Sequence, residues 1–87
     1  MACQIKILPA ALRQLESIPR RDQRRIQARI DGLARDPWPA GVKQLRGKHE
    51  FLRIRCGHYR IIYTVERDRL IVLIIKIGHR PEVYRHL

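Results

Sequence analysis

The hydrophobic and polar positions in the first half of the chain follow two different periods. Residues 4–8 (Gln-Ile-Lys-Ile-Leu) alternate, which predicts a first β-strand. From Pro9 onward, apolar side chains recur every three or four positions, which predicts a helix that ends at Pro19. The apolar face of this helix consists of Leu8, Ala11, Leu12, Leu15 and Ile18.

A second helix is predicted between Arg20 and Arg35. Pro19 can stand as its first residue, because the missing N–H of proline costs nothing at that position. The segment from Asp36 to Pro39 contains two prolines and ends the helix, since the residue before a proline is pushed out of the helical region. Its buried stripe would consist of Ile26, Ile30, Leu33 and Ala34. The two helices should form a short antiparallel hairpin.

From Val42 onward the period changes to two. Gly57-His58 and residues 67–69 are turn sequences, and they separate three predicted strands at residues 51–56, 59–66 and 70–77. The run from Leu70 to Ile75 is apolar at odd and even positions alike, so both faces of this strand would be apolar, as is usual for an interior strand.

The order of elements predicts an α+β fold. It comprises an N-terminal strand, a helical hairpin, a three-stranded antiparallel meander and a short basic tail at residues 79–87, which could turn helical from Pro81. The helices should cover one face of the sheet in a two-layer sandwich. With 87 residues, the chain has room for a single domain, residues 1–87. No helix is left to cover the opposite face, so function is expected there.

The turn at Gly57-His58 fixes which strand positions face each other. Cys56 then pairs with Tyr59, and Arg55 with Arg60. Two arginines in facing positions repel each other, and such uncompensated strain is typical of a binding site, here for phosphate. One face of the hairpin collects a plausible core of Leu52, Ile54, Cys56, Tyr59, Ile61, Tyr63 and Val65. The other face collects Arg53, Arg55 and Arg60.

The third strand adds to this basic face in one of two registers. If residues 67–69 form a three-residue turn, Lys76 lies opposite Arg60, and Gly78 and Arg80 continue on the same side. A two-residue turn would instead direct Lys76 into the core. We favour the first register because burial of a lysine is costly.

Charge then narrows the class of partner. Nineteen basic residues face eight acidic ones, for a net charge of +11, and fifteen of the nineteen are arginine. This balance favours phosphate backbones, anionic membranes or acidic proteins as partners, and arginine favours bidentate phosphate contacts.

The two cysteines, Cys3 and Cys56, have no metal-ligand spacing, and the N-terminus lacks the apolar segment of a signal peptide. We expect a cytoplasmic protein with reduced thiols and no membrane-spanning segment.

No zinc, P-loop, dinucleotide or Ser/His/Asp pattern is present, and the carboxylates are few and scattered. We therefore expect no metal and no cofactor. Cleavage of RNA by its own 2′-hydroxyl fits what remains, because the enzyme then needs only positive charge, positioning and one or two proton carriers. Packing explains His79 and Tyr84 only in part, whereas Tyr59 and Tyr63 are better explained as core.

Four segments together resemble the RelE/ParE toxin superfamily. They are Lys43-Gln-Leu-Arg-Gly47, Leu52-Arg-Ile-Arg55, Tyr59-Arg-Ile-Ile-Tyr63 and Gly78-His-Arg-Pro-Glu-Val-Tyr84. The last segment resembles the RelE ribonuclease branch more than the gyrase-poisoning ParE branch. The resemblance implies a RelE-like fold and a metal-independent endoribonuclease that cuts messenger RNA in the decoding site of the small ribosomal subunit. It also implies an acidic antitoxin as partner, with the toxin monomeric outside that complex.

The resemblance assigns catalytic roles to Arg53, Arg55, Arg60, Arg80 and Tyr84. Known members carry lysines at the first two positions, and arginine, unlike lysine, stays protonated. Arg53 and Arg55 should therefore bind phosphate, with Tyr84 or His79 as base and Arg80 assisting the leaving oxygen. The predicted RNA-binding set is Arg53, Arg55, Arg60, Lys76, Arg80, Arg46 and Lys48. Two alternatives stay open: a ParE-like inhibitor of DNA gyrase, and a non-catalytic module that binds RNA or the ribosome.

Overall fold

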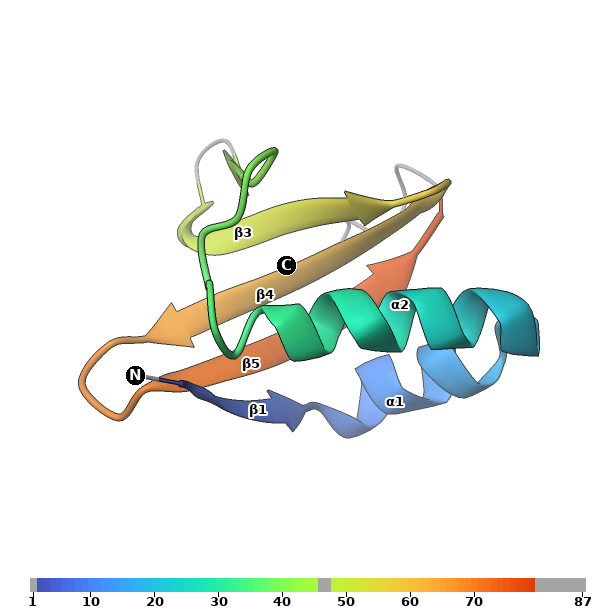
Figure 1. Cartoon of the computed structure of the whole chain (residues 1–87), viewed down its shortest axis with the longest axis horizontal. Helices are drawn as coiled ribbons and strands as arrows, with labels where there is room; N and C mark the ends of the chain where they lie inside the picture. Colours follow the sequence, from blue (N-terminus) through green and yellow to red (C-terminus); the bar gives the residue numbers. More distant parts are fainter. Residues whose placement is uncertain (1, 46–47, 80–87) are drawn as a thin grey trace.

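The computed structural model describes residues 2–45 and 48–79, with the backbone alone for residues 48 and 49. Two helices and five strands follow one another along the chain (Figure 1). In order they are β1 (Gln4–Ile7), α1 (Pro9–Glu16), α2 (Arg20–Gly32), β2 (Lys43–Leu45), β3 (Lys48–Cys56), β4 (Tyr59–Glu66) and β5 (Ile71–Gly78). The predicted helical tail, Arg46, Arg80 and Tyr84 lie outside the described residues.

The five strands form one sheet in the order β1-β5-β4-β3-β2. β1 runs parallel to β5, and the other neighbours are antiparallel. The helical hairpin carries the chain from β1 at one edge of the sheet to β2 at the other edge, and the antiparallel strands that follow bring β5 back beside β1. The α+β architecture is as predicted, but the sequence analysis missed β2, which makes β3 an interior strand.

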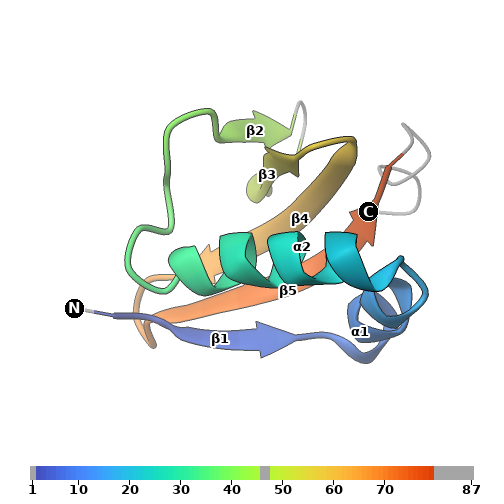
Figure 2. The same ribbon diagram turned by 45° about the vertical axis from the view of Figure 1, so that its right-hand side comes forward.

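Both helices pack on one face of the sheet. Figures 1 and 2 show both helices on the same side of the sheet, where α1 contacts β5 and α2 contacts β3. Ala11 and Leu15 of α1 and Ile26 and Ile30 of α2 are buried with one face of β3, β4 and β5. The predicted apolar face of the hairpin is part of this core, where Ile54, Ile61 and Tyr63 are almost fully buried.

Prolines set the boundaries of the helices. Pro9 begins α1, and Pro19 occupies the position before α2, where neither needs to donate a hydrogen bond. α2 ends at Gly32, earlier than predicted, and the next residues continue as turns with hydrogen bonds over three positions, such as Ala34 N to Asp31 O at 3.2 Å. Neither described helix is long and apolar enough to cross a membrane.

Tyr63 anchors the segment after α2 to the sheet. Its fully buried hydroxyl donates a 2.6 Å hydrogen bond to the carbonyl of Pro37. Burial raises the pKa of Tyr63 to about 12, with the carboxylate of Asp36 adding to the effect and Arg29 opposing it. The phenol therefore stays protonated and holds the loop that leads to β2.

Candidate nucleic-acid interface

The β3–β4 hairpin has the register expected from its turn. Gly57 has a φ of +61°, which a glycine adopts without strain. Cys56 pairs with Tyr59 and Arg55 with Arg60. The two arginines stand directly opposite each other, because cross-strand partners share a face of the sheet.

Lys76 lies on the same face, but not where the sequence placed it. It pairs with Ile62, and Gly78 takes the place opposite Arg60. The prediction that Lys76 faces Arg60 was wrong because the turn before β5 is one residue longer than assumed, and Leu70 enters it with a φ of 53°. That length alone would direct Lys76 to the core. A β-bulge at Ile75, between the pairs Tyr63–Ile74 and Ile62–Lys76, shifts the register by one residue and returns Lys76 to the face of Arg60.

Arg53 corrects the expectation of a fully open face. Its side chain is only 6% exposed, and its partner Ile62 is completely buried. The sequence analysis treated β3 as an edge strand, whereas β2 pairs with it and places Lys43 on the other side of Arg53. Arg55 is exposed, and Arg60 and Lys76 are half-buried. The accessible part of the basic face thus lies near the tip of the hairpin. We call Arg53, Arg55, Arg60 and Lys76 the basic strand cluster.

Basic side chains at the two ends of the hairpin differ in their partners. At the far end, Arg69 Nε donates to Glu66 at 2.7 Å, and Arg67 lies 4.9 Å from the centroid of the Trp38 ring. At the tip, neither Arg53 nor Arg55 has a carboxylate within ion-pair distance in the described part of the chain. Within residues 2–45 and 48–79, these two charges are therefore left without a carboxylate partner.

The imidazole of His79 is separated from the basic strand cluster. Its ring centroid lies 5.6 Å from that of Tyr59, whose side chain belongs to the helix-side face of the hairpin. The main chain of His79 meets the cluster, since Arg60 Nη1 donates to its carbonyl oxygen at 3.4 Å. The structure thus brings Arg53, Arg55, Arg60 and Lys76 to one face, but not the His79 ring.

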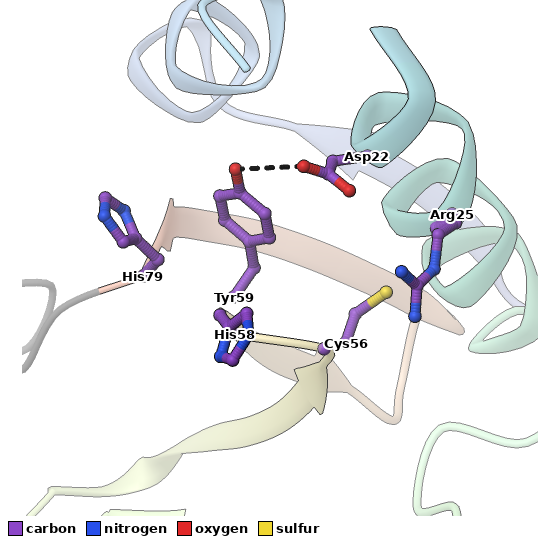
Figure 3. Close-up of a pocket in the computed structure, with 7 residues that line it drawn as sticks. Asp22, Arg25, Cys56, His58, Tyr59 and His79 are labelled. Atoms are coloured by element: carbon purple, nitrogen blue, oxygen red, sulfur yellow. Dashed lines mark hydrogen bonds between the residues drawn. The ribbon is translucent and has the colours of Figure 1, made fainter. Parts of the chain in front are cut away.

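Tyr59 does more than fill the core. It is half-buried and its hydroxyl donates to Asp22 Oδ2 at 3.3 Å, linking the hairpin to α2. Burial raises the pKa of the Tyr59 phenol, and the negative charge of Asp22 and this hydrogen bond raise it further. These groups border a pocket of about 390 Å³, here called the hairpin-tip pocket and shown in Figure 3. It is lined by Asp22, Arg25, Cys56, Gly57, His58, Tyr59 and His79.

Sequence reasoning missed Asp22 and Arg25 as site residues. They come from α2 and meet the hairpin only after the helix has packed on the sheet, so no local pattern marks them. Among the described residues, no group of three His, Cys, Asp or Glu side chains could hold a metal ion, and Cys3 and Cys56 are free thiols.

A comparison with known protein families shows to which family the chain belongs. The family model described as ParE toxin of type II toxin-antitoxin system, parDE, matches residues 5–84. The chain belongs to the RelE/ParE family of toxins. The toxin is 29% identical to the putative toxin RelE1 of Methanocaldococcus jannaschii, and the match covers 99% of both chains. It is 26% identical to toxin RelG of Mycobacterium tuberculosis over 98% of this chain and 99% of that one.

Solved structures confirm the RelE-like fold of the toxin. The RelE–RelB complex of Pyrococcus horikoshii is matched with a TM-score of 0.81 at 30% identity, over 93% of this chain and 98% of that one. The toxin–antitoxin complex RelBE2 of Mycobacterium tuberculosis is matched with a TM-score of 0.82 at 26% identity, over 92% and 93% of the two chains. The toxin thus carries its arginine pair on a scaffold found in both complexes.

Proposed function

We propose that this toxin is a metal-independent endoribonuclease that cleaves messenger RNA on the ribosome. The observation that carries the proposal is the facing pair Arg55 and Arg60, in a cluster where Arg53 and Arg55 have no carboxylate partner among the described residues. Like charges held opposite each other lower the stability of the free protein. An RNA phosphate bound between them relieves this repulsion and accepts charge-assisted hydrogen bonds from both arginines. The likeness to proteins named RelE supports the same reading.

In the proposed mechanism the substrate supplies its own nucleophile. The 2′-hydroxyl attacks the adjacent phosphate, the bond to the 5′-oxygen breaks, and a 2′,3′-cyclic phosphate remains. Arg55 and Arg60 hold the phosphate and stabilise the charge that develops on it. Neither acts as base, because the guanidinium group stays protonated. The base is assigned to Tyr84 and help for the leaving oxygen to Arg80, two residues of the tail. The His79 ring lies beside Tyr59, whose side chain belongs to the helix-side face, and this position argues against His79 as base.

The partner proposed for the free toxin is an acidic antitoxin. A net charge of +11 on 87 residues favours an acidic chain that covers the basic strand cluster and so excludes RNA. The two complexes named above, in which a RelE-type toxin is bound to its antitoxin, support this arrangement. The toxin would act in the cytoplasm, where messages and ribosomes are found.

The proposal is tested by mapping the 5′ ends of cellular messages shortly after the toxin is induced. Wild type should produce new ends within coding sequences, and Arg55→Ala and Arg60→Ala should lose most of them. Arg13→Ala, which removes the same charge from an exposed site on α1, is the matched control and should cleave as wild type does. Intact messages in wild-type cells would refute the proposal.

A gyrase inhibitor is the second candidate, because the matching family model describes ParE toxins. The same induction separates the two. A gyrase inhibitor would produce DNA damage with intact messages, whereas a ribonuclease would arrest translation first. Intact messages and DNA, with RNA binding that weakens steeply as salt rises, would identify the non-catalytic module instead.

A further inference from the structure

The hairpin-tip pocket has no role in the proposed cleavage. Figure 3 shows Asp22 and Arg25 of α2 facing the hairpin, with Tyr59 between Asp22 and His79. Its volume of about 390 Å³ lies within the usual range for small-ligand sites, roughly 300–1,000 Å³. A carboxylate, a guanidinium group, a phenol and two imidazole side chains thus line one cavity.

We propose that the hairpin-tip pocket binds a guanine base of the RNA strand whose phosphates lie on the basic strand cluster. This inference rests on the proposed function and names the base that the toxin selects. Unpaired RNA bases bind proteins by stacking on aromatic rings and guanidinium planes, and by hydrogen bonds along their edges. The rings of Tyr59 and His79 are tilted by 57°, so they offer a base two differently oriented surfaces.

Guanine matches the polar groups of the pocket better than any other base. It alone presents two adjacent N–H donors, at N1 and N2, and a carboxylate such as Asp22 can accept both. The Tyr59 hydroxyl uses one acceptor site of Asp22 Oδ2, so Oδ1 and the second acceptor site of Oδ2 can take the two donors of the base. The opposite edge of guanine carries the acceptors O6 and N7, the preferred partners of arginine.

Arg25 is placed to serve that second edge. Its guanidinium group lies over the turn, with a nitrogen 3.6 Å from the point where a Cβ on Gly57 would stand. The described part of the chain holds no hydrogen bond or ion pair of Arg25, so its donors are available. Asp22 and Arg25 are three residues apart on one helix and therefore lie on the same side of it.

The pocket and the basic strand cluster meet at the tip of the hairpin. Arg55 and Arg60 form the pair next to Cys56 and Tyr59, and these two pairs point to opposite faces. The hydrogen bond from Arg60 to the carbonyl of His79 joins a wall of the pocket to the cluster. An RNA strand that crosses the cluster can therefore place one base around the tip.

The test measures binding of short oligouridines with 2′-O-methyl sugars, which cannot be cleaved, and one central purine. Guanosine should bind about tenfold more tightly than inosine, which lacks the N2 amine. Asp22→Asn should abolish this preference while keeping the affinity for the inosine strand. Arg25→Gln should abolish the preference for guanosine over 7-deazaguanosine, which lacks the N7 acceptor. Arg24→Gln, an exposed neighbour on α2, is the control and should keep both preferences.

Equal binding of the guanosine and inosine strands by wild type would overturn the inference, as would a preference that survives in Asp22→Asn. If the pocket variants weaken only antitoxin binding, the pocket serves a protein partner and the inference is equally wrong. Failure of the proposed function gives a different result, because cellular messages would then stay intact after the wild-type toxin is induced. Arg25→Gln changes an exposed side chain, so it keeps the test decisive if Asp22→Asn does not fold.

Discussion

Replacement of Arg55 by glutamate should stabilise the free toxin while it weakens RNA binding. Arg55 is exposed, stands opposite Arg60 and has no carboxylate partner in the described structure, so the change removes a repulsion without breaking an ion pair. Facing like charges cost, and facing opposite charges gain, about 0.2–1 kcal/mol each. The exposure of Arg55 screens both effects, so we expect a net gain of about 1 kcal/mol in the free energy of unfolding.

Urea unfolding at low salt measures this gain, and Arg13→Glu is the control for the general effect of lowering a net charge of +11. In 1 M salt, where the screening length falls to about 3 Å, the gain should disappear. RNA affinity at low salt should fall by about tenfold or more, because a like charge then faces the phosphate. An Arg55→Glu protein less stable than wild type, or a gain that 1 M salt leaves unchanged, would refute the reasoning.

Three further predictions concern stability. Tyr63→Phe leaves the carbonyl of Pro37 without its buried donor and should cost about 1–3 kcal/mol in urea unfolding; a cost near zero would contradict the anchoring role. Because folding raises the pKa of Tyr63 from 10.0 to about 12, its contribution is complete below pH 10 and is lost as the pH rises toward 12. Wild type should therefore lose stability in that window faster than Tyr63→Phe, and parallel curves would disprove the shift. Gly57→Ala places a side chain at a φ of +61° and should cost about 1–2 kcal/mol; an unchanged urea midpoint would argue against that backbone geometry.

The hairpin register could be predicted because it depends on local sequence. A two-residue turn with glycine fixes every cross-strand pair in β3 and β4, so Arg55 and Arg60 follow from the position of Gly57. The helices were equally accessible, since prolines mark where each begins and apolar spacing marks the buried side. These features need only information from neighbouring residues.

Other features depend on contacts between distant segments. β2 has three residues, two of them exposed, and exists because it pairs with β3, so no periodicity reveals it. The burial of Arg53 follows from that missed strand. The bulge at Ile75 sets the place of Lys76 and has no sequence signal. The hairpin-tip pocket joins Asp22 to Tyr59, which are 37 residues apart and meet only when α2 docks on the hairpin.

The basic strand cluster explains how a stable scaffold can hold a repulsive surface. The core beneath the hairpin is closely packed, with Ile54 and Ile61 almost fully buried directly behind the Arg55–Arg60 pair. Burial of such side chains contributes about 1.5–3 kcal/mol each, more than the cost of the facing charges. The fold therefore keeps the arginines in place until an anionic partner arrives.

The salt dependence of RNA binding tests the central claim most directly. For wild type, Arg55→Ala and Arg13→Ala, the association constant for an uncleavable single-stranded RNA is measured from 50 to 300 mM salt. Each phosphate contact contributes about 0.7 to the slope of log K against log salt. We predict that Arg55→Ala lowers the slope by about 0.7 and that Arg13→Ala leaves it unchanged. Equal slopes for wild type and Arg55→Ala would contradict the claim that RNA phosphate binds between the facing arginines.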